Sequence, residues 1–263
     1  MNSRVLLGQY IPGDSPIHEL DPRAKILLTL VFMVVCFLTD SFLGYGISAL
    51  FLLSVVIISG IPIKMVFRGL KPIFAILIFT TLINMWTTPG EVVWSWWIFK
   101  FSREGFWRAL FIAIRIIQLV TGTTLLTLTT SPLQLTDGLE AIFSPLKRIG
   151  FPAHEIAMMT SIALRFIPTL FEEAEKIMKA QKARGADFES KRFLDMAKAM
   201  IPLMVPLFLN AIKRADELGV AMEARCYRGG EGRTRLNPLV FTKKDLAASL
   251  VVFTGMVALA YFF

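Results

Sequence analysis

Cysteine, histidine and charged residues are scarce in this 263-residue chain, which has 2 cysteines, 2 histidines and 18% charged residues. Two cysteines exclude a disulfide-rich scaffold and a cysteine-rich zinc fold, and two histidines leave little for a metal centre. The chain has no Gly-Lys dipeptide, so it lacks the phosphate-binding loop of P-loop ATPases. It also has no Gly-x-Ser-x-Gly nucleophile motif. We therefore predict no catalytic residue, no metal site, no cofactor and no enzymatic activity of its own.

Apolar residues make up 55% of the chain without counting glycine, whereas soluble domains reach about 45–50% with glycine included. Long apolar runs at 26–39, 42–62, 72–86, 106–129 and 246–263 predict about five transmembrane helices. The first run is short, and we expect Arg23 and Lys25 to extend it by reaching the membrane surface. The predicted fold class is an all-α integral membrane protein in the lipid bilayer.

The net charge of +8 is unevenly distributed along the chain. Lysine and arginine gather in residues 1–25, 63–71 and 130–245, whereas the connection between the first two apolar runs has none. Because basic loops stay on the cytoplasmic side, we predict a plasma-membrane protein with a cytoplasmic N-terminus and an outside C-terminus. The basic excess then needs no nucleic-acid partner, and the sequence shows no recognisable nucleic-acid-binding module.

Three regions follow from this pattern: residues 1–129 with four spans, a cytoplasmic or interfacial region at 130–245, and a final span at 246–263. Arg115 is the one charge deep within a span. It either pairs inside the helix bundle or serves a transport pathway. The threonines between residues 121 and 130 are open to the same two interpretations, although threonine in apolar helices usually bonds its own backbone.

The region 130–245 contains an internal repeat. Two long helices are predicted, at about 152–186 and 197–225, and each is apolar in its first half and charged in its second. A single offset aligns the two charged halves, with the matched pairs Ala174 with Ala215, Glu175 with Asp216, Ile177 with Leu218, Ala180 with Ala221, Ala183 with Ala224, and Arg184 with Arg225.

Each predicted helix ends in Ala-Arg-small, as Ala183-Arg184-Gly185 and Ala224-Arg225-Cys226. One arginine at a helix C-terminus commonly complements the helix dipole, which contributes about 0.3–1 kcal/mol. Two such ends favour another use, because arginine presents a planar fork of five donors on a long stem. We expect each tip to enter an acidic groove on a partner, which suggests two partner subunits or a partner dimer.

With these residues in view, the chain resembles the transmembrane (T) component of energy-coupling factor (ECF) transporters for vitamins and metals, a type of ABC transporter. The resemblance spans nearly the whole chain. Three segments carry it, which are Gly8-Gln9-Tyr10-Ile11-Pro12-Gly13-Asp14-Ser15 continuing to Lys25, Arg165-Phe166-Ile167-Pro168 continuing to Gly185, and Arg214-Ala215-Asp216-Glu217-Leu218 continuing to Arg225.

The resemblance implies a membrane-embedded coupling subunit for vitamin or micronutrient uptake. Its partners would be two cytoplasmic ATP-binding subunits, as a homodimer or heterodimer, and a membrane S component that binds the substrate. Movement of the ATPases would pass through Arg184 and Arg225 into the two helices and tilt the S component. Ala183, Gly185 and Ala224 would give each tip clearance. Cys226 stands where glycine or another small residue is common, and we expect small size to be what matters there.

The resemblance also assigns residues along the apolar halves of the coupling helices. Helix bends are expected where proline removes a backbone hydrogen bond, at Pro168, Pro202 and Pro206. The candidates for S-component contact are Phe166, Ile167, Met204, Leu207 and Phe208.

Two other functions stay open from the residues alone. An autonomous channel or secondary carrier would transport by itself and would need Arg115 or the threonines. A membrane scaffold would use the arginine tips to dock another acidic protein, without a nucleotide cycle.

Overall fold

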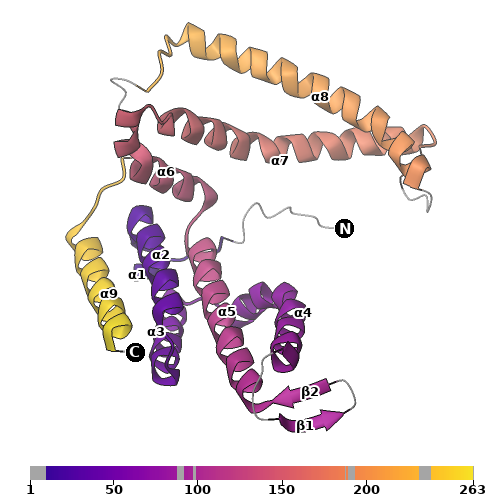
Figure 1. The fold of residues 1–263 in the computed structure, drawn as a ribbon. Coiled ribbons are helices and arrows are strands. Elements are labelled where there is room, and N and C mark those ends of the chain that lie inside the picture. The colour runs from indigo at the N-terminus through magenta and orange to yellow at the C-terminus, as the bar shows by residue number, and fades with distance from the viewer. Residues whose placement is uncertain are drawn as a thin grey trace. The chain divides into compact units, whose positions relative to one another are not determined.

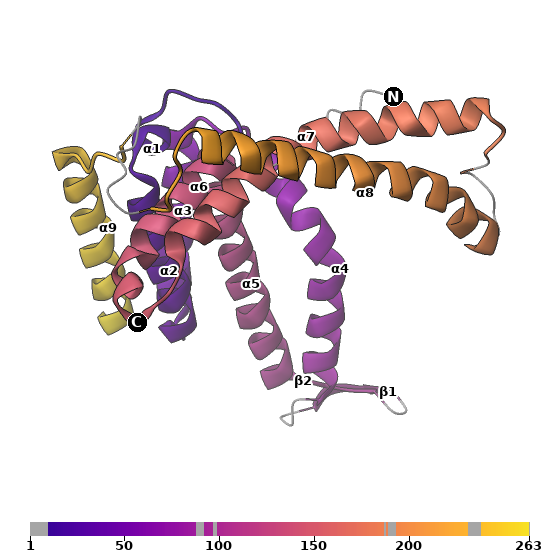
Figure 2. The same cartoon turned by 90° about the horizontal axis from the view of Figure 1, so that it is seen from above.

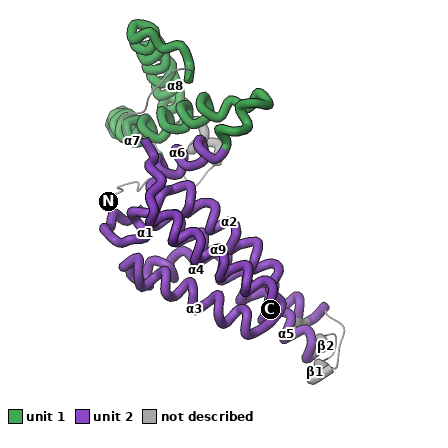
Figure 3. The backbone as a smooth tube through the Cα atoms, turned by 90° about the vertical axis from the view of Figure 1, so that its left-hand side faces the viewer, with its two compact units in different colours: residues 1–7, 143–237 green, residues 8–142, 238–263 purple. Residues whose placement is uncertain are grey.

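The computed structural model describes residues 10–87, 92–96, 99–186, 188, 193–230 and 238–262. The chain forms two compact units, which Figure 3 shows in different colours. We call residues 8–142 with 238–263 the membrane unit, and residues 1–7 with 143–237 the two-helix unit. These units divide the chain at other points than the three regions expected from sequence, because the helix over 132–143 belongs largely to the membrane unit.

Where the structure describes the membrane unit, its regular elements are helices and one short hairpin (Figure 1). Its elements in chain order are α1 (Pro16–Glu19), α2 (Pro22–Leu38), α3 (Phe42–Ser59), α4 (Ile63–Thr87), β1 (Val92–Trp96), β2 (Phe99–Ser102), α5 (Arg103–Thr129), α6 (Pro132–Phe143) and α9 (Lys243–Phe262).

Four of these helices, α3, α4, α5 and α9, are long and apolar enough to cross a membrane. The remaining predicted span is α2, which has 17 residues against 18 for α3. The predicted all-α membrane protein is confirmed. Lys25, however, does not extend α2 toward the surface as expected. It is buried, and its Nζ donates to the carbonyls of His18 at 3.0 Å and Thr129 at 3.1 Å.

The third span begins earlier than predicted, because α4 starts at Ile63 and contains Pro72. Proline leaves a backbone carbonyl of its helix unpaired, and Figure 1 shows α4 changing direction along its length. The helix packs closely on α5. A side chain at Gly69 would place its Cβ 2.8 Å from Oγ1 of Thr124, so only glycine fits this contact without a shift.

The antiparallel hairpin β1–β2 was not predicted from the sequence. Val92 pairs with Ser102 and Trp96 pairs with Phe99, with an irregularity between Val92 and Trp94. The segment appears in the sequence only as a tryptophan-rich connection between two spans, a composition typical of a membrane interface. The hairpin leads directly into α5.

A continuous apolar core holds the bundle together. It joins α2, α3, α4, α5 and α9, and its members are Phe32, Val35, Cys36, Leu52, Val56, Ile61, Val66, Leu125, Leu128, Met256 and Leu259. The N-terminal ends of α2 and α9 are also tied by Asp245. One of its carboxylate oxygens accepts from the Asp21 N–H at 2.8 Å, and the other accepts from the Thr242 N–H at 2.8 Å. Thr242 and Asp245 therefore cap α9 and anchor it to α2.

The two-helix unit contains η1 (Ser144–Ile149), α7 (Ala153–Ala183) and α8 (Phe193–Ala224). The latter two are the long helices predicted from the repeat, and α8 begins earlier than predicted, at Phe193 rather than at 197. They contact each other and run in opposite directions, as Figure 2 shows.

Candidate functional site

The contact between α7 and α8 is made by equivalent residues of the repeat. Arg214 Nη2 lies 3.2 Å from Glu173 Oε2, and the offset that aligns Ala174 with Ala215 also aligns these two residues. Asn210 Nδ2 donates to the other Glu173 oxygen, Oε1, at 2.6 Å. A contact between equivalent residues of two opposed helices gives the pair a local two-fold relation. Phe166 lines a cavity beside this contact, so part of its side chain faces α8.

Each helix continues for the same length beyond the contact, from 173 to 184 in α7 and from 214 to 225 in α8. At about 1.5 Å per residue, each arginine tip lies roughly 16 Å along its helix from the contact. Because the helices run in opposite directions, the tips lie at opposite ends of the pair, roughly 30 Å apart along it. The fold therefore presents two separate tips rather than one combined patch.

The two tips have the same hydrogen-bonded ending. At the end of α7, the Gly185 N–H donates to Lys182 O and the Ala186 N–H donates to Gln181 O, both at 3.0 Å. At the end of α8, the corresponding bonds run from Cys226 to Glu223 at 2.8 Å and from Tyr227 to Met222 at 3.0 Å. Every donor and acceptor matches its counterpart at the offset of the repeat. Both ends are Schellman motifs, and the arginine is the last, capping residue of each helix.

A left-handed backbone follows each arginine. Gly185 has φ +89°, and Cys226, with φ +57°, is the one non-glycine residue at positive φ in the described part of the chain. Glycine adopts this conformation freely, whereas a residue with a Cβ is disfavoured there. The residue after the arginine is thus selected by backbone conformation as well as by the small size expected from sequence.

Both arginine side chains project from the surface. Arg184 and Arg225 are exposed, as are Ala183 and Ala224 before them. Neither guanidinium forms an ion pair with another residue that the structure describes. Each tip therefore presents its five-donor fork at the end of a long helix.

The predicted S-component residues differ in exposure. Met204 is 60% exposed and Phe208 is 66% exposed, whereas Phe166, Ile167 and Leu207 are only partly exposed. The two exposed residues belong to a stripe along α8 at helical spacing, made of Ile201, Met204, Val205, Phe208 and Ile212, all exposed. We call this set the α8 apolar stripe. The prolines expected to bend the helices lie inside them, Pro168 in α7 and Pro202 and Pro206 in α8.

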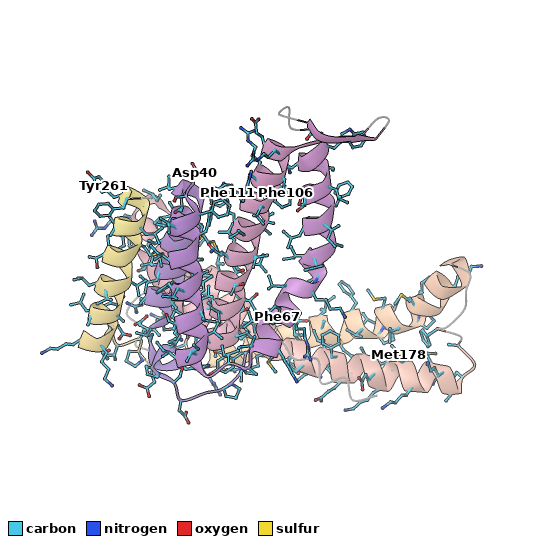
Figure 4. The ribbon with its side chains drawn as sticks, turned by 90° about the horizontal axis from the view of Figure 1, so that it is seen from below. Asp40, Phe67, Phe106, Phe111, Met178 and Tyr261 are labelled. Atoms are coloured by element: carbon cyan, nitrogen blue, oxygen red, sulfur yellow. The ribbon has the colours of Figure 1, made fainter. Side chains whose placement is uncertain are left out.

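Arg115, the charge within a span, has partners in the bundle. Its Nη2 donates to Thr39 O and to Asp40 Oδ1, each at 3.0 Å, and its Nε donates to Tyr45 Oη at 2.8 Å. Asp40 lies at the end of the bundle where α9 finishes with Tyr261, as Figure 4 shows. Arg115 therefore ties α5 to the α2–α3 connection near one end of the bundle. Asp40 follows directly after the first apolar run in the sequence, and this position could have identified it as the partner of Arg115.

Gln118 and four threonines of α5 are also bonded inside the membrane unit. Gln118 donates to Tyr45 O at 2.8 Å and accepts from Ser48 Oγ at 2.9 Å. The hydroxyls of Thr121, Thr123, Thr127 and Thr129 all donate to carbonyls of their own helix, which is the usual behaviour of threonine in apolar helices.

Comparisons with known proteins agree with this architecture. The family described as CbiQ, cobalt transport protein, matches residues 13–236. The chain belongs to the CbiQ family. A protein of Thermosediminibacter oceani named energy-coupling factor transporter transmembrane protein EcfT is 52% identical over 254 residues, covering 97% of this chain and 95% of that protein. A Bacillus subtilis protein of the same name is 46% identical over 259 residues, covering 97% and 98%.

The resemblance stated from the sequence is thereby confirmed. This CbiQ-family chain is a multi-pass transmembrane component of an ECF transporter. Its three sequence segments of resemblance include both arginine tips, and the fold places those tips on two matching helix ends.

Proposed function

We propose that this chain is the coupling subunit of its transporter. In this role it transmits ATP-driven movement of two cytoplasmic ATP-binding subunits to a membrane S component that binds a vitamin or another micronutrient. The chain itself supplies no ATP site. The proposal includes the topology expected from the basic residues, with the N-terminus and residues 130–245 in the cytoplasm and the C-terminus outside.

The observation that carries this proposal is the matched pair of tips. Arg184 and Arg225 have the same capping bonds and the same exposure, and they lie at opposite ends of two helices joined at Glu173 and Arg214. Two matched docking points suit two subunits of one kind. A scaffold that docks a single acidic protein has no need of two equivalent tips.

The contact between the helices supports transmission of force. A movement that pulls one tip acts through a rigid helix of about 16 Å on the ion pair at Glu173 and Arg214. The angle between the apolar halves of α7 and α8 then changes. Pro168, Pro202 and Pro206 lower the resistance of those halves to bending, because each removes one helical hydrogen bond.

The α8 apolar stripe is the proposed contact for the S component, together with the partly exposed Phe166, Ile167 and Leu207. A row of exposed large apolar side chains marks an interaction surface for protein or lipid. Met204 and Phe208 are its most exposed members, together with Ile201.

Co-purification of the tagged chain from native membranes tests both assignments. The wild-type chain should bring down two ATP-binding subunits and a small membrane protein. Arg184→Glu with Arg225→Glu should remove the ATP-binding subunits and retain the membrane protein. Met204→Glu with Phe208→Glu should do the reverse.

Two control variants separate docking from general effects of charge. Arg228→Glu reverses an exposed arginine just beyond the second tip, and Val220→Glu places a carboxylate at a 67% exposed position of α8 outside the stripe. Both controls should retain all partners. If the tip variants keep the ATP-binding subunits, the arginines are ordinary helix ends and the proposal is wrong.

A further inference from the structure

A second candidate site lies within the membrane unit. A cavity of about 650 Å³ opens among α1, α2, α3, α5 and α9, within the ~300–1,000 Å³ range of sites for small molecules. Its inner wall is apolar and includes Leu28, Phe32, Leu52, Leu125 and Val252. Such a wall suits a hydrocarbon chain.

The polar end of this cavity carries three ammonium groups, from Lys25, Lys243 and Lys244. Two carboxylates also line it, Glu19 and Asp245. Both oxygens of Asp245 are already occupied by the Asp21 and Thr242 N–H groups, so this carboxylate is committed to capping α9. Glu19 is exposed to solvent, as are Lys243 and Lys244.

Lys25 is the unusual member of this group, because it is only 6% exposed. Its Nζ has three protons to donate, and two of them go to the carbonyls of His18 and Thr129. Among the residues that the structure describes, no carboxylate lies within ion-pair distance of this ammonium. The carboxylates of Asp21 and Asp245 act on this ammonium only from beyond that distance. An anion in the space that the ammonium lines would give its third proton a charged partner within bonding distance.

We infer that this cavity binds an anionic phospholipid, with one acyl chain among α2, α3, α5 and α9 and the phosphate held by Lys243 and Lys244 beside Lys25. Basic pockets between transmembrane helices on the cytoplasmic side are suited to anionic lipid head groups. The lysine end of α9 lies opposite the end marked by Tyr261 (Figure 4), and the proposed topology makes it cytoplasmic. The site does not depend on the coupling role of the arginine tips.

Native mass spectrometry of the full chain in detergent tests the lipid site, with phosphatidylglycerol, phosphatidylcholine and oleic acid as probes. We expect retention of phosphatidylglycerol over the other two. Lys243→Gln with Lys244→Gln should lower that retention about thirtyfold. The matched control is Lys64→Gln with Lys71→Gln, which removes two exposed lysines of α4 that do not line the cavity.

A second pair of variants tests the cavity without changing charge. Ala248→Phe places a ring in the cavity, whereas Ala247→Phe adds the same ring on an exposed position of α9 outside it. Only Ala248→Phe should lose phosphatidylglycerol.

Equal retention of phosphatidylglycerol and phosphatidylcholine by the wild-type chain would overturn the lipid site. So would equal losses in the lysine variants and their control, or oleate binding that persists without Lys243 and Lys244. Arg184→Glu should leave lipid retention unchanged, which separates this site from the coupling proposal.

Discussion

Glu173 and Arg214 form an ion pair of 3.2 Å between α7 and α8, although they occupy the same position in two copies of one repeat. The two copies of the repeat thus contact each other at equivalent positions. Because the two tips lie equally far along the chain beyond this pair, an inward pull at either tip acts with an equal lever arm. On the proposed function, this symmetry would give each of two ATP-binding subunits an equivalent lever on the S component.

Reversing the charge at this contact should reduce coupling. Glu173→Arg or Arg214→Glu places like charges together and should lower ATP-driven substrate uptake in reconstituted vesicles. Both residues are partly exposed, so we expect a coupling energy of about 0.5–1 kcal/mol in a double-mutant cycle. The double variant, with the charges exchanged, should recover much of the uptake. Loss of uptake that the exchange fails to recover would contradict a role for this pair.

The left-handed residue after each arginine predicts opposite responses to two substitutions. Gly185→Ala adds a Cβ at φ +89° and should destabilise the end of α7 by about 1 kcal/mol. Cys226→Gly relieves a strained φ of +57° and should stabilise the end of α8 by a similar amount. Hydrogen exchange at the amides of Ala186 and Tyr227 measures both effects.

Gly219→Ala serves as the control for these caps, because Gly219 lies inside α8 with open space around its Cα. It should stabilise the helix by about 0.5–1 kcal/mol without changing the capping bonds. Faster exchange at Tyr227 in Cys226→Gly would show that the cysteine contributes something other than a strained cap.

Arg115 should matter for stability more than for transport. Arg115→Leu removes the charged hydrogen bonds to Thr39 O, Tyr45 Oη and Asp40 Oδ1, at a cost of about 1–3 kcal/mol. The Thr39 carbonyl then keeps the Tyr45 hydroxyl as its side-chain donor. Thermal unfolding in detergent should show a lower Tm, with Arg115→Lys intermediate because it lacks the planar fork. A variant that keeps the wild-type Tm and loses uptake would instead place Arg115 on a transport pathway.

The lowered pKa of His18 predicts that the folded protein loses stability in mild acid. Burial and the nearby Lys25 ammonium lower the pKa of His18 below 6.5. The unfolded chain therefore binds the proton more readily than the folded chain. The contribution of neutral His18 to the stability of the fold is complete above pH 6.5. It is lost as the pH falls from there through the lowered pKa of His18 in the folded chain.

The neutral ring of His18 suits its two hydrogen bonds, since one nitrogen donates to Ile11 O at 3.1 Å and the other can accept from Ser15 Oγ at 2.7 Å. Tm measured across this pH range should fall more in the wild-type chain than in His18→Gln. An identical pH dependence in both would contradict the assignment.

Much of this architecture could be predicted from local sequence signals. Length and hydropathy predict the spans, and the repeat predicts α7 and α8 with their arginine ends. These features depend on residues close together in the chain. The left-handed backbone at Cys226 was not predicted, because cysteine seldom adopts it.

Tertiary partners could not be predicted in the same way. Lys25 lies at the start of an apolar run, where lysines commonly reach the membrane surface. The carbonyls of His18 and the distant Thr129 instead hold its ammonium inside the bundle. The contact of Glu173 with Arg214 depends on how two helices fold back on each other. The cavity is lined from five helices, so no single stretch of sequence reveals it.

The number of ATP-binding subunits retained by each tip variant tests the central claim most directly. Native mass spectrometry of the purified transporter counts them in the wild type, in Arg184→Glu, in Arg225→Glu and in the double variant. If each tip holds its own subunit, the counts fall from two to one in either single variant and to none in the double variant. Retention of both subunits in the double variant would contradict the account.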